Sequence, residues 1–144
     1  MKWFNYLGLI SLIIIMIPNI VFVVKNKDGF VNKYHNKIVE TLEQIGRFGS
    51  FIFMVINLPY VTLGYWLSNG ETIYLIIIIV LTLVYVLGWI IFWNENSLRK
   101  SLLLSIVPSL LFILCGVILL NIPLIITSII FAPCHIIISC KNCE

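Results

Sequence analysis

One side chain that can exchange a proton lies deep inside an apolar run of this chain. His135 follows Pro133 and Cys134 within residues 101–140, which contain no Asp, Glu, Lys or Arg. Burying an ionisable group in such a run costs free energy, so a histidine there is typically a proton acceptor, a ligand or a hydrogen-bond donor. The alternative is a neutral histidine bonded to a neighbouring carbonyl, which would be a purely structural role.

Amide side chains accompany several of the prolines in the apolar runs. A proline inside a helix frees the carbonyl four residues earlier, and transporters build midplane polar sites from such broken helices. Kinked helices whose polar groups satisfy one another are the alternative. The pairs are Pro18 with Asn19, Pro59 with Asn57, and Pro123 with Asn121. The substrate-binding site expected from this pattern consists of His135, Asn57, Asn19, Tyr60, Ser105 and Ser109.

The most charged stretch of the chain, residues 25–47, has the pattern of an amphipathic helix. Its apolar residues recur at helical spacing, which predicts a cytoplasmic helix over about 30–46 that lies on the inner leaflet. On the other face, Glu43 and Arg47 are spaced for an ion pair. We interpret this face as a rim that receives a soluble partner or a metal, with a solvated helix face as the alternative. The rim residues are Lys33, His35, Lys37, Glu40, Glu43 and Arg47.

All four cysteines lie in the last thirty residues of the chain. Cys140 and Cys143 form a C-x-x-C pair, a spacing used by zinc sites and by redox dithiols. No second C-x-x-C pair is present to complete a four-cysteine site, and reduced, inert thiols are the favoured interpretation. If a metal does bind, its candidate ligands are Cys134, His135, Cys140 and Cys143.

The composition places the chain in a membrane. It has 144 residues, of which 61% are hydrophobic and 10% charged, and this is too apolar for an ordinary soluble domain. We predict an all-α polytopic membrane bundle that forms a single integral membrane domain over 1–144. The frequent use of Ile, Asn and Lys favours an AT-rich bacterial genome, and so a bacterial inner membrane.

Five apolar runs are long enough to cross about 30 Å of hydrocarbon. The run 101–140 would be about 60 Å long as one helix, so the chain must turn within it, and Asn121 with Pro123 marks the turn. A four-span protein whose last segment is re-entrant or interfacial is the alternative. The predicted spans are 3–24, 48–68, 73–93, 101–120 and 123–140.

The distribution of cations predicts the orientation in the membrane. Lys and Arg concentrate in the first and third connections, and cytoplasmic loops carry such an excess. The N-terminus is therefore expected outside the cell and the C-terminus in the cytoplasm of a multi-pass plasma-membrane protein. The cations concerned are Lys25, Lys27, Lys33, Lys37, Arg47, Arg99 and Lys100.

The function favoured by these patterns is non-enzymatic binding or transport of a small solute or ion at a polar site in the inner half of the bundle. One alternative is an accessory, assembly or immunity-type subunit acting through the amphipathic helix. A second is a small membrane enzyme using His135 and the cysteines. We expect no cofactor and no nucleic acid, since phosphate-loop motifs and basic patches interleaved with aromatics are missing. The expected partners are the lipid bilayer and either further copies of the chain or a larger membrane protein.

Overall fold

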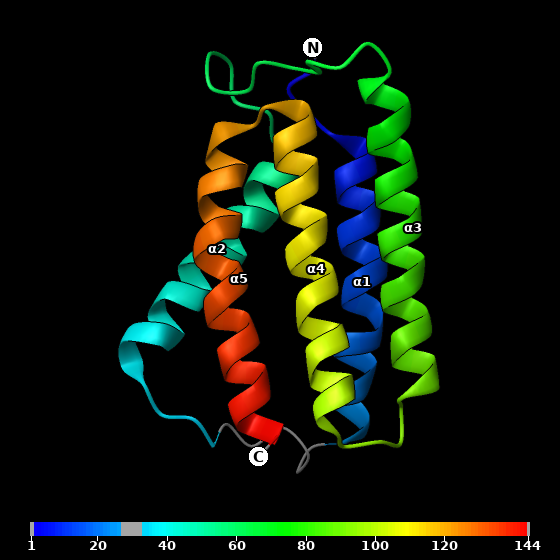
Figure 1. Cartoon of the computed structure of the whole chain (residues 1–144), viewed down its shortest axis with the longest axis vertical. Helices are drawn as coiled ribbons and strands as arrows, with labels where there is room; N and C mark the ends of the chain where they lie inside the picture. The colour runs from blue at the N-terminus through cyan, green and yellow to red at the C-terminus, as the bar shows by residue number, and fades with distance from the viewer. Residues whose placement is uncertain (1, 27–32, 144) are drawn as a thin grey trace.

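The protein is a bundle of five helices that run alternately up and down (Figure 1). The computed structural model describes residues 2–26 and 33–143, and these ranges contain two isolated β-bridges but no strand. The first and last described residues lie at opposite ends of the bundle. The helices are α1 (Tyr6–Lys25), α2 (Lys37–Val55), α3 (Gly70–Ile91), α4 (Leu98–Leu119) and α5 (Ile122–Cys143).

Four of the helices, α1, α3, α4 and α5, are long and apolar enough to cross a membrane. Each has 20 to 22 residues, which corresponds to about 30 Å at 1.5 Å per residue. Their outward faces are covered by exposed isoleucine, leucine and valine side chains, as lipid-facing surfaces require. The fold therefore fits a small multi-pass integral membrane protein.

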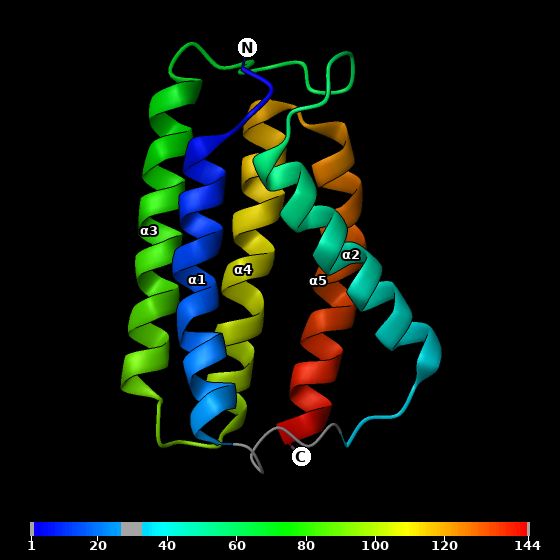
Figure 2. The same ribbon diagram turned by 180° about the vertical axis from the view of Figure 1, so that it is seen from behind.

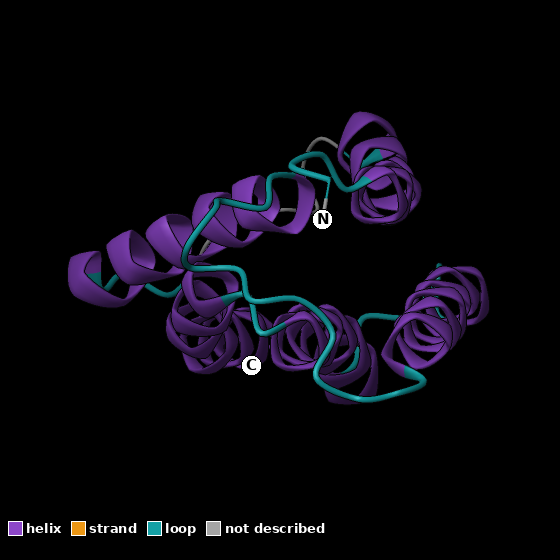
Figure 3. Ribbon diagram, turned by 90° about the horizontal axis from the view of Figure 1, so that it is seen from above, coloured by secondary structure: helices purple, strands orange, loops and turns teal. Residues whose placement is uncertain are grey.

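The helices form two layers when seen along the bundle (Figure 3). Helix α4 lies between α3 and α5, and it has the largest buried share of the four apolar helices. On one face of this row, α2 packs on α5 and α1 packs on α3. Helices α1 and α2 converge near one end of the bundle and diverge toward the other (Figure 2). Within the described residues, the backbone of α1 does not approach that of α4 or α5, with no Cα–Cα distance of 8 Å or less between them.

Helix α2 corrects the predicted second span. We predicted an interfacial helix over 30–46 and a span over 48–68, but one continuous helix begins at Lys37 and ends at Val55. The first three residues of the predicted interfacial helix, 30–32, lie outside the described residues. The chain leaves helical geometry at Ile56, whose backbone is extended. Pro59 explains part of the error, because it disfavours helical geometry at the residue before it and has no N–H to donate.

Residues 56–69 instead close one end of the bundle, which we call the outer end. Asn57 N donates to Trp3 O over 2.8 Å, which ties the loop to the start of the chain. Further along, Leu63 N donates to Leu120 O over 3.1 Å, which ties the loop to the turn between α4 and α5. The loop thus satisfies backbone groups that have no helical partner.

The turn between α4 and α5 confirms the predicted division of residues 101–140 into two helices. It is closed by Leu120, which has a left-handed backbone (φ 46°), and by Asn121, which is 1% exposed. Asn121 Oδ1 accepts from Leu124 N, and its Nδ2 donates to Phe53 O over 2.9 Å. The side chain therefore caps α5 and holds the last turn of α2 against it.

At the other end of the bundle, which we call the inner end, Lys100 joins three helices. Its Nζ donates to Trp93 O over 3.3 Å and lies 4.5 Å and 4.9 Å from the ring centroids of Phe22 and Trp89. The ammonium group is thus held by aromatic faces from α1 and α3, while Lys100 itself belongs to α4. This arrangement anchors α1 to the rest of the bundle at the inner end.

Candidate functional site

The candidate site is a cluster of three ionisable side chains, Glu43 and Arg47 on α2 and His135 on α5. The three groups meet at one atom, Glu43 Oε1. His135 Nδ1 lies 3.0 Å from this oxygen, Arg47 Nε donates to it over 3.0 Å, and Arg47 Nη2 also contacts it. The predicted ion pair between Glu43 and Arg47 is confirmed.

The three members of the cluster differ in burial. The side chain of Glu43 is 4% exposed, that of His135 22% and that of Arg47 41%. The carboxylate is therefore the buried centre, and the two nitrogen groups lie between it and the surface. We had interpreted this helix face as the rim of the site; Glu43 instead contacts His135 directly, and Arg47 contacts Glu43.

The geometry assigns the proton on His135. An ionised carboxylate can only accept hydrogen bonds, so the Nδ1 atom facing Glu43 Oε1 must carry a proton. The second ring nitrogen, Nε2, is then the atom at which the imidazole gains or loses charge. The ring stacks on Phe131, with centroids 4.5 Å apart and an interplanar angle of 20°, which fixes its orientation.

The charge on Glu43 is held by its neighbours. Burial raises the pKa of this carboxyl group, but the hydrogen bond from His135 and the positive charge of Arg47 outweigh burial and lower the pKa below its usual range. Glu43 is thus ionised at neutral pH.

Small residues on α2 bring the two helices close enough for this contact. A Cβ atom on Gly46 would lie 2.6 Å from Phe131 N, and one on Gly49 would lie 2.5 Å from Thr127 Cγ2. One turn further, Ser50 Oγ donates to Thr127 Oγ1 over 3.4 Å. The antiparallel register of this seam places Glu43 opposite His135, one turn beyond Gly46.

Helix α2 turns its polar side toward the protein. Glu43, Gly46 and Ser50 are buried. The apolar side, by contrast, has no cover within the described residues, and Ile38, Ile45 and Phe48 are each more than half exposed. This is the reverse of a soluble amphipathic helix, and it is the arrangement expected where lipid is the surrounding medium.

A second polar contact joins α1 to α3. Asn19 Nδ2 donates to Tyr85 Oη over 2.8 Å and to Ile15 O over 2.7 Å. Arg47 lies within electrostatic reach of Tyr85. Of the predicted substrate-binding residues, His135 contacts Glu43, and Asn19 contacts Tyr85, on which Arg47 acts electrostatically.

The other predicted substrate-binding residues lie elsewhere. Asn57 is in the outer-end loop, where its Nδ2 donates to Lys2 O over 3.0 Å. Tyr60 is in the same loop and is 94% exposed. Ser105 and Ser109 donate to carbonyls of their own helix, Ser101 O and Ser105 O respectively. The structure does not bring Asn57 or Tyr60 to His135.

The predicted rim divides into two parts. Glu43 and Arg47 belong to the cluster, whereas Lys33, His35 and Lys37 are exposed at the inner end. Glu40 is half-buried. The backbone N–H groups of Lys33 and Tyr34 both donate to Asn142 Oδ1, which ties the start of this segment to the end of α5.

The candidate metal ligands do not form a cluster. Cys134 is buried beside Glu43, while Cys140 and Cys143 are partly exposed toward the end of α5. Across residues 2–26 and 33–143, no group of three or more His, Cys, Asp or Glu side chains is arranged to hold a metal ion. The cysteines are reduced within these ranges.

Sequence reasoning missed two residues of this region. Tyr85 was not selected, although it is a tyrosine in the middle of an apolar run and so requires a polar partner. Phe131 was not selected either. Its i, i+4 spacing from His135 lets the two rings stack within a helix, but phenylalanine is common throughout the chain, so this spacing did not draw attention to it.

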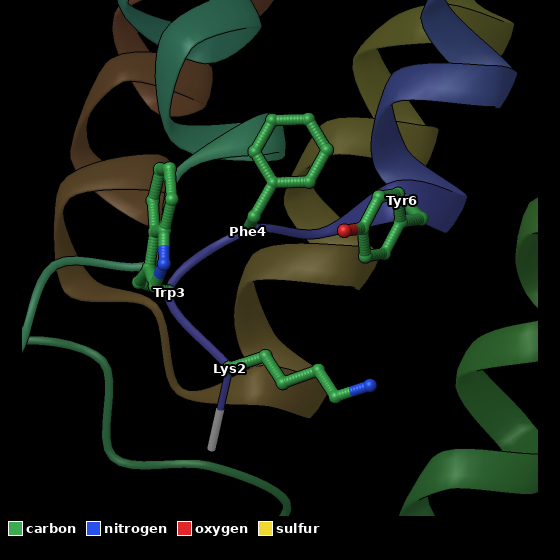
Figure 4. Close-up of a pocket in the computed structure, with 4 residues that line it drawn as sticks. All are labelled: Lys2, Trp3, Phe4 and Tyr6. Atoms are coloured by element: carbon green, nitrogen blue, oxygen red, sulfur yellow. The ribbon is translucent and has the colours of Figure 1, made fainter.

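An aromatic depression lies at the outer end of the bundle, beside the start of the chain. Lys2, Trp3, Phe4 and Tyr6 line it, and Figure 4 shows the three rings around the chain before α1. The ring centroids of Trp3 and Phe4 are 5.6 Å apart, and Trp3 and Tyr6 are more than 60% exposed. Exposed aromatic rings at one end of apolar helices are typical of a membrane interface.

The fold fits a small multi-pass helical membrane protein, and the site is an ionisable cluster between two of its helices. Comparisons of the chain with models of protein families, with curated proteins and with solved structures find no match. A function must therefore be argued from the cluster itself.

Proposed function

We propose that this protein binds or passes a small solute or ion at the cluster of Glu43, Arg47 and His135, without enzymatic chemistry. The observation that carries the proposal is the bond between the 4% exposed Glu43 carboxylate and His135 across two helices. Charged groups in apolar bundles cost free energy to bury, and helical membrane proteins keep them mainly along substrate or ion pathways.

The position of the cluster supports this proposal. It lies on the side of the bundle where α1 and α2 diverge, and Arg47 is 41% exposed there. Within electrostatic reach of Arg47, the hydroxyl of Tyr85 and the amide of Asn19 bonded to it supply further polar groups. A small polar solute entering from the inner end would meet hydrogen-bonding groups from four helices.

Reconstituted vesicles provide the test. The purified chain is placed in lipid vesicles, and gradients of protons, potassium, sodium and chloride are imposed one at a time while internal pH and membrane potential are followed by dyes. We expect one gradient to dissipate faster with the protein, and His135→Gln to abolish the increase. The matched control is His35→Gln, the same change at an exposed histidine outside the cluster. If His135→Gln and His35→Gln give the same flux, the cluster is not the site of transport.

The proposed orientation has the inner end in the cytoplasm. Lys25, Arg99 and Lys141 all lie at the inner ends of their helices, whereas Lys2 lies at the outer end. This asymmetry follows the rule that cytoplasmic loops are rich in lysine and arginine. A membrane-impermeant thiol reagent should label the partly exposed Cys143 only when the cytoplasmic face is accessible. Labelling from the outside of intact cells would reverse the orientation.

A second candidate function is that of an accessory subunit bound to a larger membrane protein through α2. The observation that favours it is the exposed apolar side of α2, formed by Ile38, Ile45 and Phe48. Lys33 and Lys37 lie at the exposed start of this surface. If a partner binds there, charge reversal of both lysines should release it from the purified complex. Retention of the partner would count against this candidate.

A further inference from the structure

We infer that the ligand of the cluster is a small monovalent anion, and that it binds together with one proton. This inference rests on the proposed function and specifies the ligand of the same site. It is drawn from the charges and hydrogen-bond donors of three residues, Glu43, Arg47 and His135, and from their burial.

The charge balance of the cluster leads to this ligand. With neutral His135, the Glu43 carboxylate and the Arg47 guanidinium cancel, so the cluster carries no net charge. With protonated His135, it carries one positive charge. A net charge is costly in a region of low dielectric constant, so the protonated cluster is stable only with a counter-anion. Proton binding and anion binding are thereby coupled, and each raises the affinity for the other.

The donors in the cluster also suit an anion. Glu43 Oε1 accepts from Nε and Nη2 of Arg47, so the Nη1 end of the guanidinium is left for another acceptor. His135 uses Nδ1 for Glu43, so protonation adds an N–H at Nε2. Both groups are partly exposed, which makes them accessible to an entering ion. Stacking on Phe131 further favours the charged imidazolium.

A metal cation is a poor alternative ligand. It would have to share one carboxylate with the guanidinium of Arg47, which already contacts Glu43 Oε1 and repels other cations. Within the described ranges, no group of three or more His, Cys, Asp or Glu side chains is arranged to hold a metal ion. Alkali and divalent cations bind through several oxygen ligands, a requirement that this single carboxylate does not meet.

The groups that face His135 set the expected pH dependence. From α2 these are Glu43 and Arg47, and on its own helix Cys134 is adjacent. From α3, Tyr85 is within electrostatic reach of Arg47. Binding is therefore compared at two pH values within about pH 5 to 8, the range in which imidazole side chains in general change charge.

Chloride and acetate binding to the protein in nanodiscs tests the inference. Chloride binding is measured by the broadening of its nuclear magnetic resonance line, and acetate binding by calorimetry. We expect affinity to be roughly tenfold or more higher at about pH 5.5 than at about pH 8, as one linked proton allows. Arg47→Gln and His135→Gln should each abolish binding at the lower pH. The controls Arg99→Gln and His35→Gln change exposed residues outside the cluster and should bind as the wild type does.

Glu43→Gln gives the sharpest result. Removal of the carboxylate leaves the positive charge of Arg47 without a counter-charge at either pH. The affinity of the variant for the anion should therefore be the same at the two pH values to within about twofold. Glu71→Gln, the same change in the first turn of α3, should keep the pH dependence of the wild type. Equal loss of binding in Glu43→Gln at both pH values, with the helix content retained, would overturn the inference.

The two proposals can fail separately. If neither anion binds at either pH, while His135→Gln still abolishes the flux of another ion in vesicles, the inference of an anion is wrong and the proposed function stands. If vesicles show no flux and no ligand binds at the cluster, the proposed function is wrong as well. Anion binding that is equal in wild type and Arg47→Gln would contradict the inference directly.

Discussion

Glu43 on α2 and His135 on α5 are 92 residues apart in sequence, and their side chains bind each other with 3.0 Å between Oε1 and Nδ1. The contact joins α2 to α5. Of the described helices, α2 alone is not long and apolar enough to cross a membrane, whereas α5 is. The contact therefore places an ionisable pair between α2 and α5.

Loss of Glu43 should destabilise the fold more than loss of Arg47. Glu43→Ala removes the buried partner of two groups, so we expect a loss of about 3 kcal/mol, the range for breaking a buried pair. Arg47→Ala should cost about 1 kcal/mol or less, because its side chain is 41% exposed and solvent screens the pair. Unfolding in detergent mixtures measures both values. If Arg47→Ala lowers the unfolding free energy more than Glu43→Ala does, the guanidinium also stabilises contacts with helices other than α2.

Acid should weaken the wild type and leave Glu43→Gln less affected. The folded pKa of Glu43 is lowered, so its stabilising charge is fully present above the unfolded value of about 4.3 and is lost as the pH falls through the lower folded pKa. The unfolding free energy, measured between about pH 6 and about pH 3, should therefore fall more steeply for the wild type than for the variant. Parallel curves would show that Glu43 contributes no linked stability.

Gly46 should tolerate alanine less well than Gly49. The added Cβ at Gly46 meets the backbone of Phe131 at 2.6 Å, whereas at Gly49 it meets a side-chain methyl group of Thr127. A side chain can rotate away but a helix backbone must shift, so Gly46→Ala should cost about 2 kcal/mol, which exceeds the gain of about 1 kcal/mol in helix propensity. Gly49→Ala should cost less, because its added Cβ meets only side-chain atoms of Thr127. Thermal unfolding of the two variants compares them, and equal melting temperatures would contradict the close packing.

Asn121 should be the most sensitive of the asparagines. Asn121→Leu leaves Phe53 O and Leu124 N without their side-chain partners in a buried turn, so we expect a loss of about 2 to 3 kcal/mol. Asn94→Leu, a matched change at an exposed position in the connection between α3 and α4, should cost about 0.5 kcal/mol or less. Equal unfolding free energies for the two variants would show that the cap is dispensable.

The local patterns of the sequence predicted the larger part of the fold. Apolar runs of sufficient length identified four of the helices, and Asn121 with Pro123 located the turn between the last two. The i, i+4 spacing of Glu43 and Arg47 predicted their ion pair. These features depend on residues that are neighbours along one helix, so a local pattern is enough to identify them.

The sequence could not place the second helix or assemble the site. Whether 56–68 continues as a helix or closes the outer end depends on backbone partners at Trp3 and Leu120, which are distant in the chain. Likewise, no local pattern indicates that Glu43 faces His135, because that contact depends on how closely Gly46 and Gly49 allow α2 to approach α5.

The sequence by itself therefore determined the apolar helices, the turn at Asn121 and the separation of cations between the two ends, since each follows from composition and spacing along the chain. Only the tertiary structure decided which polar groups are partners. It placed His135 with Glu43 and Arg47 and left Asn57 at the outer end. The physical reason is that helix packing depends on side-chain volume and backbone approach between segments remote in sequence, and these choose the partners of each buried charge.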